Sequence, residues 1–349
     1  MFNPEIVAIV VFLLAYILFV VFPERRTLVA ISGAVLLVIL QTVTPKEAFW
    51  AINWNVMGIF VGTLVIADIF MESRVPAYLA EKIVNRSPST LWSILWICIM
   101  TSFISAFVEN VATVLIMSPI AFALARKLKI NPTVILISIA ICSNLQGTAT
   151  LIGDPPSMLL GGFAKMNFLD FFFYKGKPSI FFAVQAGALV SFIVLYFVFR
   201  KHREKVIIVA VEKVRSWVPT IILVSLIFSL AGSSLMDTGF SYLAGIICVV
   251  FGAVALLWEK LVNQRSILHG LKKLDWETTF FLLGIFIIVG SITATGWIEK
   301  VSVSLSGIIG TNIFAGYTLL VLVSMVLSAF IDNVPFLVAM LPVAVSISQ

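Results

Sequence analysis

An apolar stretch that is interrupted near its middle is the feature of this sequence that most constrains the fold. The apolar run 134–142 gives way to a polar segment at 143–156, and a second apolar run continues to about residue 165. A continuous helix cannot pass through this segment, because glycine disfavours helix and two consecutive prolines remove backbone donors. Asp154 before Pro155 instead predicts an N-cap with proline at the first helical position. We therefore expect one membrane crossing at 134–165, made of two half-helices.

The position of this break predicts a binding site. Inside hydrocarbon, each unpaired backbone N–H or C=O group costs several kcal/mol, so irregular backbone is tolerated there only where it lines a protein or water cavity. The broken helix at 134–165 is therefore the candidate binding site of the chain.

Composition indicates a protein with several membrane spans. Of the 349 residues, 61% are apolar and 11% are charged, which is far from the balance of a soluble domain. The net charge of +6 does not predict nucleic-acid binding, because the Lys and Arg residues lie almost wholly in short loops, the pattern of topology signals. Three scattered cysteines give neither a metal cluster nor a disulfide framework, and no nucleophile–base pair points to an enzyme. We expect no cofactor other than Na⁺ or H⁺ as a coupling ion.

The apolar stretches predict an all-α polytopic fold. Those long enough to cross a bilayer lie at about 5–22, 27–43, 56–71, 178–199, 217–235, 238–258 and 276–293. Two longer stretches, 91–125 and 313–348, differ because an acid–asparagine pair divides each into two apolar arms: Glu109-Asn110 and Asp332-Asn333. Each of the two is either a re-entrant hairpin or one long kinked span.

The distribution of positive charge favours the hairpins. With the N-terminus outside and both stretches returning to the side they left, 18 Lys and Arg residues lie in inside loops and 5 in outside loops. If 91–125 crossed once instead, the division would be 9 against 14. The positive-inside rule therefore favours return, although two full short crossings give the same parity.

An internal repeat is visible in the sequence. The segment SAFVENV at 105–111 matches SAFIDNV at 328–334, with five identities and two conservative changes. Flanking residues match at offsets of 222 or 223: Trp54 with Trp276, Gly62 with Gly284, and Pro119 with Pro342. Under the topology above, span 56–71 runs inward and span 276–293 runs outward, so the two copies are inverted. Secondary transporters with inverted repeats place their binding sites at the repeat interface near the midplane.

These observations divide the chain into four parts. We expect N-terminal transmembrane helices at 1–45, a first inverted repeat at 46–199, a cytoplasmic basic loop at 200–216 and a second repeat at 217–349. At the repeat offset, the counterpart of 144–157 would fall near 367–380, beyond Gln349. We therefore expect the second repeat to be truncated.

Polar residues at the breaks are the candidate ligands of a transported solute. Asn110 and Asn333 stand where one apolar arm ends and the next begins, so their amides lie beside free helix ends that suit a cation or an anion. The alternative is that each asparagine is only a helix cap. Small side chains around the breaks complete the candidate set, with close helix packing as their alternative role: Ser105, Asn144, Gly147, Thr148, Thr150, Gly153, Ser157 and Ser328.

Three acids next to the breaks are the candidates for proton or cation coupling: Glu109, Asp154 and Asp332. An ionisable group inside a membrane protein is costly, and it commonly carries a proton or holds a cation. For Asp154 the alternative is a plain N-cap. Asp68, inside span 56–71, is a lower-ranked candidate, and the alternative is that it turns into the bundle next to Arg74 at the membrane edge. Gly58 and Gly62 are interpreted as a packing face.

The segment NLQGTATLIGDPPS at 144–157, together with the duplicated SAF-x-[ED]-NV motif, resembles the ion transporter superfamily. The similarity is to the branch of citrate transporter-like domains that holds arsenical pump membrane proteins, NhaD-type sodium/proton antiporters and the melanosomal P-protein. It extends over about 30–349. The resemblance implies hairpins docked against broken helices, an elevator-like or rocking alternation, and a homodimer. Gln146 stands where the family usually has glycine, and Ser157 where it usually has asparagine.

We expect a secondary active transporter that exchanges a cation or a metalloid, such as sodium, arsenite or antimonite, for protons. The breaks carry three acids and the spans carry no Lys or Arg, which suits a cation. The alternatives are sodium-coupled uptake of an anion or carboxylate and, outside transport, an ion channel. The expected partners are membrane lipid and a small inorganic ion or metalloid, with no nucleic acid. The expected location is the cell membrane, with loops 72–90, 126–133, 200–216 and 259–275 in the cytoplasm.

Overall fold

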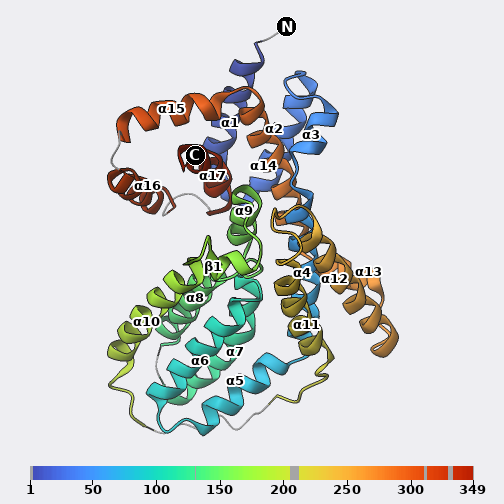
Figure 1. Cartoon of the computed structure of the whole chain (residues 1–349). Coiled ribbons are helices and arrows are strands. Elements are labelled where there is room, and N and C mark those ends of the chain that lie inside the picture. Colours follow the sequence, from blue (N-terminus) through green and yellow to red (C-terminus); the bar gives the residue numbers. More distant parts are fainter. Residues whose placement is uncertain (1–2, 130, 205–211, 310–312, 329–332, 349) are drawn as a thin grey trace. The chain divides into compact units, whose positions relative to one another are not determined.

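The computed structural model describes residues 3–129, 131–204, 212–309, 313–328 and 333–348 (Figure 1). In this part of the chain the regular secondary structure is helical apart from one short hairpin, in which β1 (Phe173–Tyr174) pairs antiparallel with β2 (Lys177–Pro178). Six of the described helices are long and apolar enough to cross a membrane, and several shorter apolar helices accompany them. The predicted all-α polytopic fold is confirmed.

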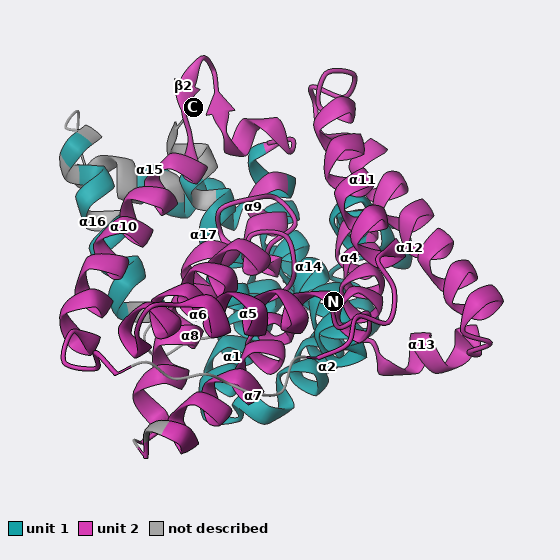
Figure 2. Ribbon diagram, turned by 90° about the horizontal axis from the view of Figure 1, so that it is seen from below, with its two compact units in different colours: residues 1–57, 162–164, 275–349 teal, residues 58–161, 165–274 magenta. Residues whose placement is uncertain are grey.

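The chain forms two compact units, each assembled from separate parts of the sequence (Figure 2). Unit 1 contains residues 1–57, 162–164 and 275–349, and unit 2 contains residues 58–161 and 165–274. Both units therefore draw helices from the early and the late part of the chain. This division differs from the sequence repeats proposed above, which stay a prediction.

Unit 1 is built around α14 (Trp276–Ala294), whose side chains are mostly buried. It packs against α1 (Pro4–Val21), α2 (Arg26–Ile39) and α3 (Pro45–Ala51), and also against α15 (Trp297–Ile309) and α17 (Asn333–Ser348). The remaining elements of the unit are the 3₁₀ turn η1 (Pro23–Arg25) and α16 (Ile313–Ser328). Arg26 donates a hydrogen bond to Thr278 Oγ1 at 3.2 Å and lies over the Phe281 ring, so its charge is held against the start of α14.

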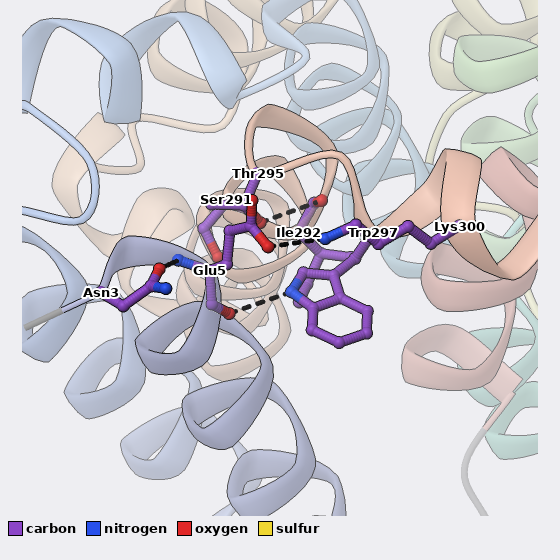
Figure 3. A network of polar contacts seen from close by, with 7 residues as sticks. All are labelled: Asn3, Glu5, Ser291, Ile292, Thr295, Trp297 and Lys300. Carbon is purple, nitrogen blue, oxygen red and sulfur yellow. Dashed lines mark hydrogen bonds and ion pairs between the residues drawn. The ribbon is translucent and has the colours of Figure 1, made fainter.

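The start of α1 is tied to α15 by polar contacts at Glu5 (Figure 3). Trp297 Nε1 donates to the Glu5 carbonyl oxygen at 2.9 Å, and Lys300 Nζ pairs with the Glu5 carboxylate at 2.6 Å. At the end of α14, Thr295 Oγ1 donates to the Ser291 carbonyl at 2.8 Å and so satisfies a helix-end acceptor. These contacts hold the first turn of α15, which follows the end of α14, beside the start of α1.

Unit 2 holds the remaining helices, including α4 (Trp54–Glu72), whose first turn belongs to unit 1. One group consists of α5 (Val75–Arg86), α6 (Thr90–Ser105), α7 (Asn110–Leu128), α8 (Thr133–Gly147) and α10 (Ile180–Phe199), which pack on one another. A second group pairs α11 (Val218–Ser233) with α12 (Leu243–Val262), followed by α13 (Ile267–Lys273). The helix α9 (Pro155–Ala164) and the turn η2 (Leu169–Phe171) lie between α8 and β1.

The described helices recur in the same order at the offset of the sequence repeat. The starts of α3, α4 and α5 match those of α13, α14 and α15 at the offset that relates Trp54 to Trp276. The starts of α6 and α7 match those of α16 and α17 at the offset that relates the two SAF motifs. Pro119 inside α7 and Pro342 inside α17 keep this second offset. The repeat seen in a short motif therefore extends to five consecutive elements.

Close helix contacts of the same kind occur at matching glycine positions of the two repeats. A Cβ atom at Gly62 on α4 would overlap the α12 backbone at Cys248, and one at Gly252 on α12 would meet the Gly62 carbonyl oxygen at 3.2 Å. In unit 1, a Cβ atom at Gly284 on α14 would meet the backbone of Ala30 on α2 at 2.6 Å. Gly62 and Gly284 correspond in the repeat, and Ala30 and Gly252 correspond at the same offset. The same close helix approach is thus made twice, and Gly62 is a packing position as predicted.

Two predicted spans have different boundaries in the structure. The span expected at 27–43 is the 14-residue helix α2, which ends at Ile39 because Gln41 takes a left-handed conformation with φ of 55° and Thr44 caps the new helix α3. The span expected at 238–258 starts later, at Leu243, because the Asp237 carboxylate accepts backbone N–H groups from Ser241, Tyr242 and Leu243 and holds them in a loop.

We expect Gly62→Ala and Gly284→Ala each to lower the thermal unfolding midpoint of the purified protein in detergent. The added methyl group would force two helices apart, and overpacking of this kind costs about 1–3 kcal/mol. Gly232→Ala on α11 is the matched control, because a Cβ atom there meets nothing within 4 Å. It should keep or raise the midpoint, since alanine favours helix by about 1 kcal/mol over glycine. Equal midpoints for all three variants would contradict the close approach.

Candidate functional site

The predicted break is present between α8 and α9. The helix α8 ends at Gly147, and α9 begins at Pro155, with Asp154 as its N-cap. The Asp154 Oδ1 atom accepts the Ser157 backbone N–H at 3.0 Å and the Ser157 hydroxyl at 2.7 Å. This is the capping geometry that an Asp-Pro pair favours at a helix start. Two helix ends, one with free carbonyl groups and one with free N–H groups, therefore face this segment.

The tip between α6 and α7 lies against the end of α8. The Ser105 hydroxyl is 2.8 Å from the Ser143 carbonyl oxygen and 3.1 Å from Asn110 Oδ1. The Ser143 hydroxyl donates to the Asn110 carbonyl oxygen at 3.0 Å, and Asn110 Nδ2 approaches Asn144 Oδ1 at 3.4 Å. Serine and asparagine side chains thus hold the tip between α6 and α7 against the end of α8.

Glycine makes the closest part of this contact possible. A Cβ atom at Gly147 would overlap Asn110 Oδ1 and would come within 2.9 Å of an Asp154 carboxylate oxygen. A Cβ atom at Gly153 would overlap the Gly147 carbonyl oxygen and meet that of Ala106 at 3.0 Å. Only a residue without a side chain fits at these two positions, which accounts for both glycines of the motif.

Hydroxyl groups bond to the carbonyl groups that the breaks leave free. Thr150 Oγ1 donates to the Ala106 carbonyl oxygen just past α6, and Ser157 Oγ lies 3.3 Å from the Gly147 carbonyl oxygen at the end of α8. Ser105, Ser143 and Thr150 are fully buried, and Asp154 is 2% exposed. Most of these oxygen atoms are therefore buried around one carboxylate, whereas Asn110 is half-buried and Asn144 is exposed. We call Ser105, Asn110, Ser143, Asn144, Gly147, Thr150, Gly153, Asp154 and Ser157 the crossover cluster.

Not every predicted residue joins the crossover cluster. The Thr148 hydroxyl donates to the Leu145 carbonyl oxygen in its own turn, at 2.9 Å. Glu109 instead lines a cavity of about 10 Å³ with Thr63 of α4 and Pro155 of α9, a volume close to that of one water.

The second acid–asparagine pair belongs to unit 1. Ser328 Oγ donates to Asn333 Oδ1 at 2.5 Å, which is the same bond that Ser105 makes to Asn110 in unit 2. Asp332 lies outside the described residues. The repeated motif therefore has the same local polar contact in both copies.

Two contacts in or next to the crossover cluster were not among the predicted residues. The first is the backbone carbonyl of Ala106, which a reading based on side-chain chemistry does not identify. The second is an amide pair in which Gln146 and Gln185 of α10 exchange hydrogen bonds at 3.1 Å. The only sequence signal for this pair was the unusual glutamine at position 146.

The charged groups around Asp68 come mainly from a later part of the chain. Its charged neighbours are Lys273, Arg265, Glu259 and His269, while Arg74 pairs with Glu212 at 2.5 Å. In the same cluster, Glu72 pairs with Lys273 at 2.5 Å and with Arg265. The sequence could not show this, because α13 is brought to α4 from a distant part of the chain. Asp68 belongs to an ionic cluster that fastens α13 to α4.

The crossover cluster contains an acidic side chain, and its hydrogen-bond partners include no basic side chain in the described residues. Within the described part of unit 2, its hydrogen-bond partners are hydroxyls, amides, backbone groups and the Asp154 carboxylate, and none of them is Lys or Arg. Helices α6 and α8 end here with partial negative charge, and α7 and α9 begin here with partial positive charge. The arrangement provides oxygen ligands for a cation beside N–H groups that suit an anion.

A comparison with models of protein families identifies the family of this chain. A model of the citrate transporter family, CitMHS, matches residues 16–349. The chain belongs to this family. It is a multi-pass membrane transporter, in agreement with the apolar helices and with the resemblance drawn from the motifs.

Several curated relatives of this CitMHS chain are transporters. An uncharacterized transporter of Mycobacterium tuberculosis (strain H37Rv) is 27% identical over 97% of this chain and 80% of the relative. An uncharacterized transporter of Synechocystis is 28% identical over 90% of this chain and 71% of the relative. The P protein of Mus musculus is 24% identical over 93% of this chain but 49% of its own length.

We expect Gly147→Ala in this CitMHS protein to lower flux by about tenfold or more, because the added methyl group displaces the Asn110 amide from a position that must hold to within about 1 Å. Gly187→Ala on α10 is the control, since a Cβ atom there meets Leu145 at an ordinary 3.6 Å. Both variants should be measured for tracer flux in proteoliposomes at equal protein density. Normal flux through Gly147→Ala would exclude the close contact from the transport site.

We also expect Asn110→Ala and Asn333→Ala each to abolish flux while the protein remains inserted in the membrane. Each change removes the amide that bonds to a serine across its turn. Asn263→Ala, at an amide whose partner is Glu259 in the preceding helical turn, should leave flux unchanged. Near-normal flux in both test variants would refute the assignment of these turns to the site.

Proposed function

We propose that this chain is a secondary active transporter that exchanges a cation or a metalloid for protons, with Asp154 as the coupling group. In this proposal the crossover cluster binds the coupling ion in unit 2. The loops 72–90, 126–133, 200–216 and 259–275 face the cytoplasm, as their positive charge favours.

The observation that carries the proposal is the environment of Asp154. Its side chain is 2% exposed, it lies where a membrane helix is broken, and its partners are Ser157 and the Asn110 amide. A buried carboxylate without a basic partner is costly unless it takes up a proton or a cation. A group that must be neutralised whenever it is buried is suited to load an ion on one side and release it on the other.

The neighbouring ligands suit a hard cation. Carbonyl oxygens of Ala106 and Gly147 and the amide oxygens of Asn110 and Asn144 lie around the same break. Oxygen donors of this kind are those that cations such as Na⁺ prefer, whereas soft metals prefer thiolate and imidazole. Within the described residues, no group of three or more His, Cys, Asp or Glu forms a metal cluster.

A second candidate is sodium-coupled uptake of a carboxylate. It is favoured by the description of the matching family as citrate transporters and by the helix starts of α7 and α9, which meet at the cluster. N–H groups at helix starts bind anions, and the cluster carbonyls would then hold the coupling sodium. The two candidates differ in whether protons move with the substrate.

The deciding experiment is flux in proteoliposomes with a pH-sensitive dye inside. Arsenite, antimonite, sodium, chloride and citrate are tested one at a time against an imposed proton gradient. The proposed exchange predicts that the gradient collapses only when the transported cation or metalloid is present. Citrate entry that needs a sodium gradient and moves no protons would favour the second candidate. Currents that follow voltage without coupling would indicate a channel.

We expect Asp154→Asn to uncouple protons from the substrate. Asparagine keeps an oxygen that can cap Ser157 but cannot carry a proton, so substrate-dependent proton movement should fall by about tenfold or more. Asp170→Asn is the matched control, because Asp170 caps the nearby Asn167 N–H outside the crossover cluster. Proton movement retained in Asp154→Asn would show that another group carries the coupling.

A further inference from the structure

A cavity of about 420 Å³ lies between α6, α8 and α10 in unit 2. Its walls are mostly apolar side chains, including Ile99, Leu145, Leu189 and Leu195. Polar groups are few and uncharged: two thiols, two serine hydroxyls and the amide pair of Gln146 and Gln185. A volume within the range of ligand pockets, apolar walls and a few convergent polar groups are the features of a small-molecule site.

This cavity is separate from the crossover cluster. Neither Asn110 nor Asp154 is among its lining residues in the described part of the chain. The lining also contains no Lys, Arg, Asp or Glu, so a charged head group would lose its hydration without gaining a partner. The cavity therefore suits an uncharged ligand.

The position of the cavity indicates where its ligand comes from. The helix α10 is a candidate membrane span, and Leu189 lines the cavity while 66% of its surface is exposed. Its neighbours Val190, Ile193 and Val194 on the same helix are also exposed and apolar, as expected of a surface that faces lipid. A molecule can thus enter the cavity beside Leu189 from the bilayer.

We propose that this cavity binds a single-chain lipid with an uncharged hydrogen-bonding head, such as a long-chain alcohol. The chain lies along the apolar side chains of α6 and α10, and the head lies at the amide pair. Gln146 directly precedes Gly147. A ligand that changes the hydrogen bonds between Gln146 and Gln185 therefore acts on the end of α8. Occupancy therefore slows transport, a consequence that rests on the proposed function, whereas the binding itself does not.

The binding is tested with a photoactivatable diazirine analogue of hexadecanol in phosphatidylcholine proteoliposomes that contain the full chain. Crosslinked peptides are identified by mass spectrometry. We expect labelling of α6 and α10 residues at the cavity to exceed labelling of α12, which is also apolar and exposed to lipid, by about fivefold or more. Excess unlabelled hexadecanol should remove this labelling, and hexadecane should not. Labelling spread evenly over α10 and α12 would overturn the proposal.

A pair of variants on one helix provides the control. Ala188→Trp places a large ring in the cavity, and Val190→Trp places the same ring on a residue that does not line it and is 62% exposed. We expect Ala188→Trp to lose the cavity labelling and Val190→Trp to keep it. Should Ala188→Trp fail to insert, the competition by hexadecanol against hexadecane in the unmodified protein decides the question alone.

The effect on transport is measured in the same vesicles. Added hexadecanol should lower flux about twofold or more in the unmodified protein and in Val190→Trp, and should have no effect in Ala188→Trp. Specific labelling with unchanged flux would confirm the binding site and overturn its effect on transport. Loss of flux in all variants alike would show an effect on the bilayer and would overturn the regulatory role.

Discussion

The structure around the site depends on the carbonyl groups that interrupted helices leave without partners inside a membrane. The chain satisfies these carbonyls crosswise. Thr150 from one break bonds to the Ala106 carbonyl at the other, and Ser105 beside that second break bonds to the Ser143 carbonyl near the end of α8. Because such groups are costly to leave unpaired in hydrocarbon, each interruption is stabilised by the other. The small serine, threonine and glycine residues therefore hold the two breaks together, and the proposed function assigns the same oxygen atoms to an ion.

The matching ends of the two repeats use different interactions for the same helix contact. The helix α3 lies on α14 through Ala51 against Gly290, where a Cβ atom would come within 2.6 Å. Its counterpart α13 is fastened to α4 by the ion pairs of Glu72 with Lys273 and Arg265. The same helix contact is thus made twice, with apolar side chains in one copy and ion pairs in the other. Salt weakens the ionic contact between α13 and α4, but it does not weaken the apolar contact between α3 and α14 in this way.

Much of this was readable from the sequence. Gly147, Gly153 and Pro155 predict the break because their backbone limits are local properties, and the Asp154 cap follows from the same residues. The repeated SAF motif identifies both asparagine turns. Contacts between distant segments were not readable: Asp68 meets a helix from the late part of the chain, and Gln185 meets Gln146 from another span. The shortened helix α2 was also missed, because Thr44 and Glu47 form a capping box that starts a new helix inside an apolar stretch.

The contacts at Gly62 and Gly284 limit the order in which helices can pack during synthesis. Gly62 packs on Gly252, and Gly284 packs on Ala30, so each early helix finds its partner only after most of the chain has been synthesised. At 5–20 residues per second, the stretch between Gly62 and Gly252 takes roughly 10 to 40 s to translate. During that interval α4 lacks the α12 partner that packs on Gly62. Among the described helices, these two contacts therefore form only after both halves of the chain have been made.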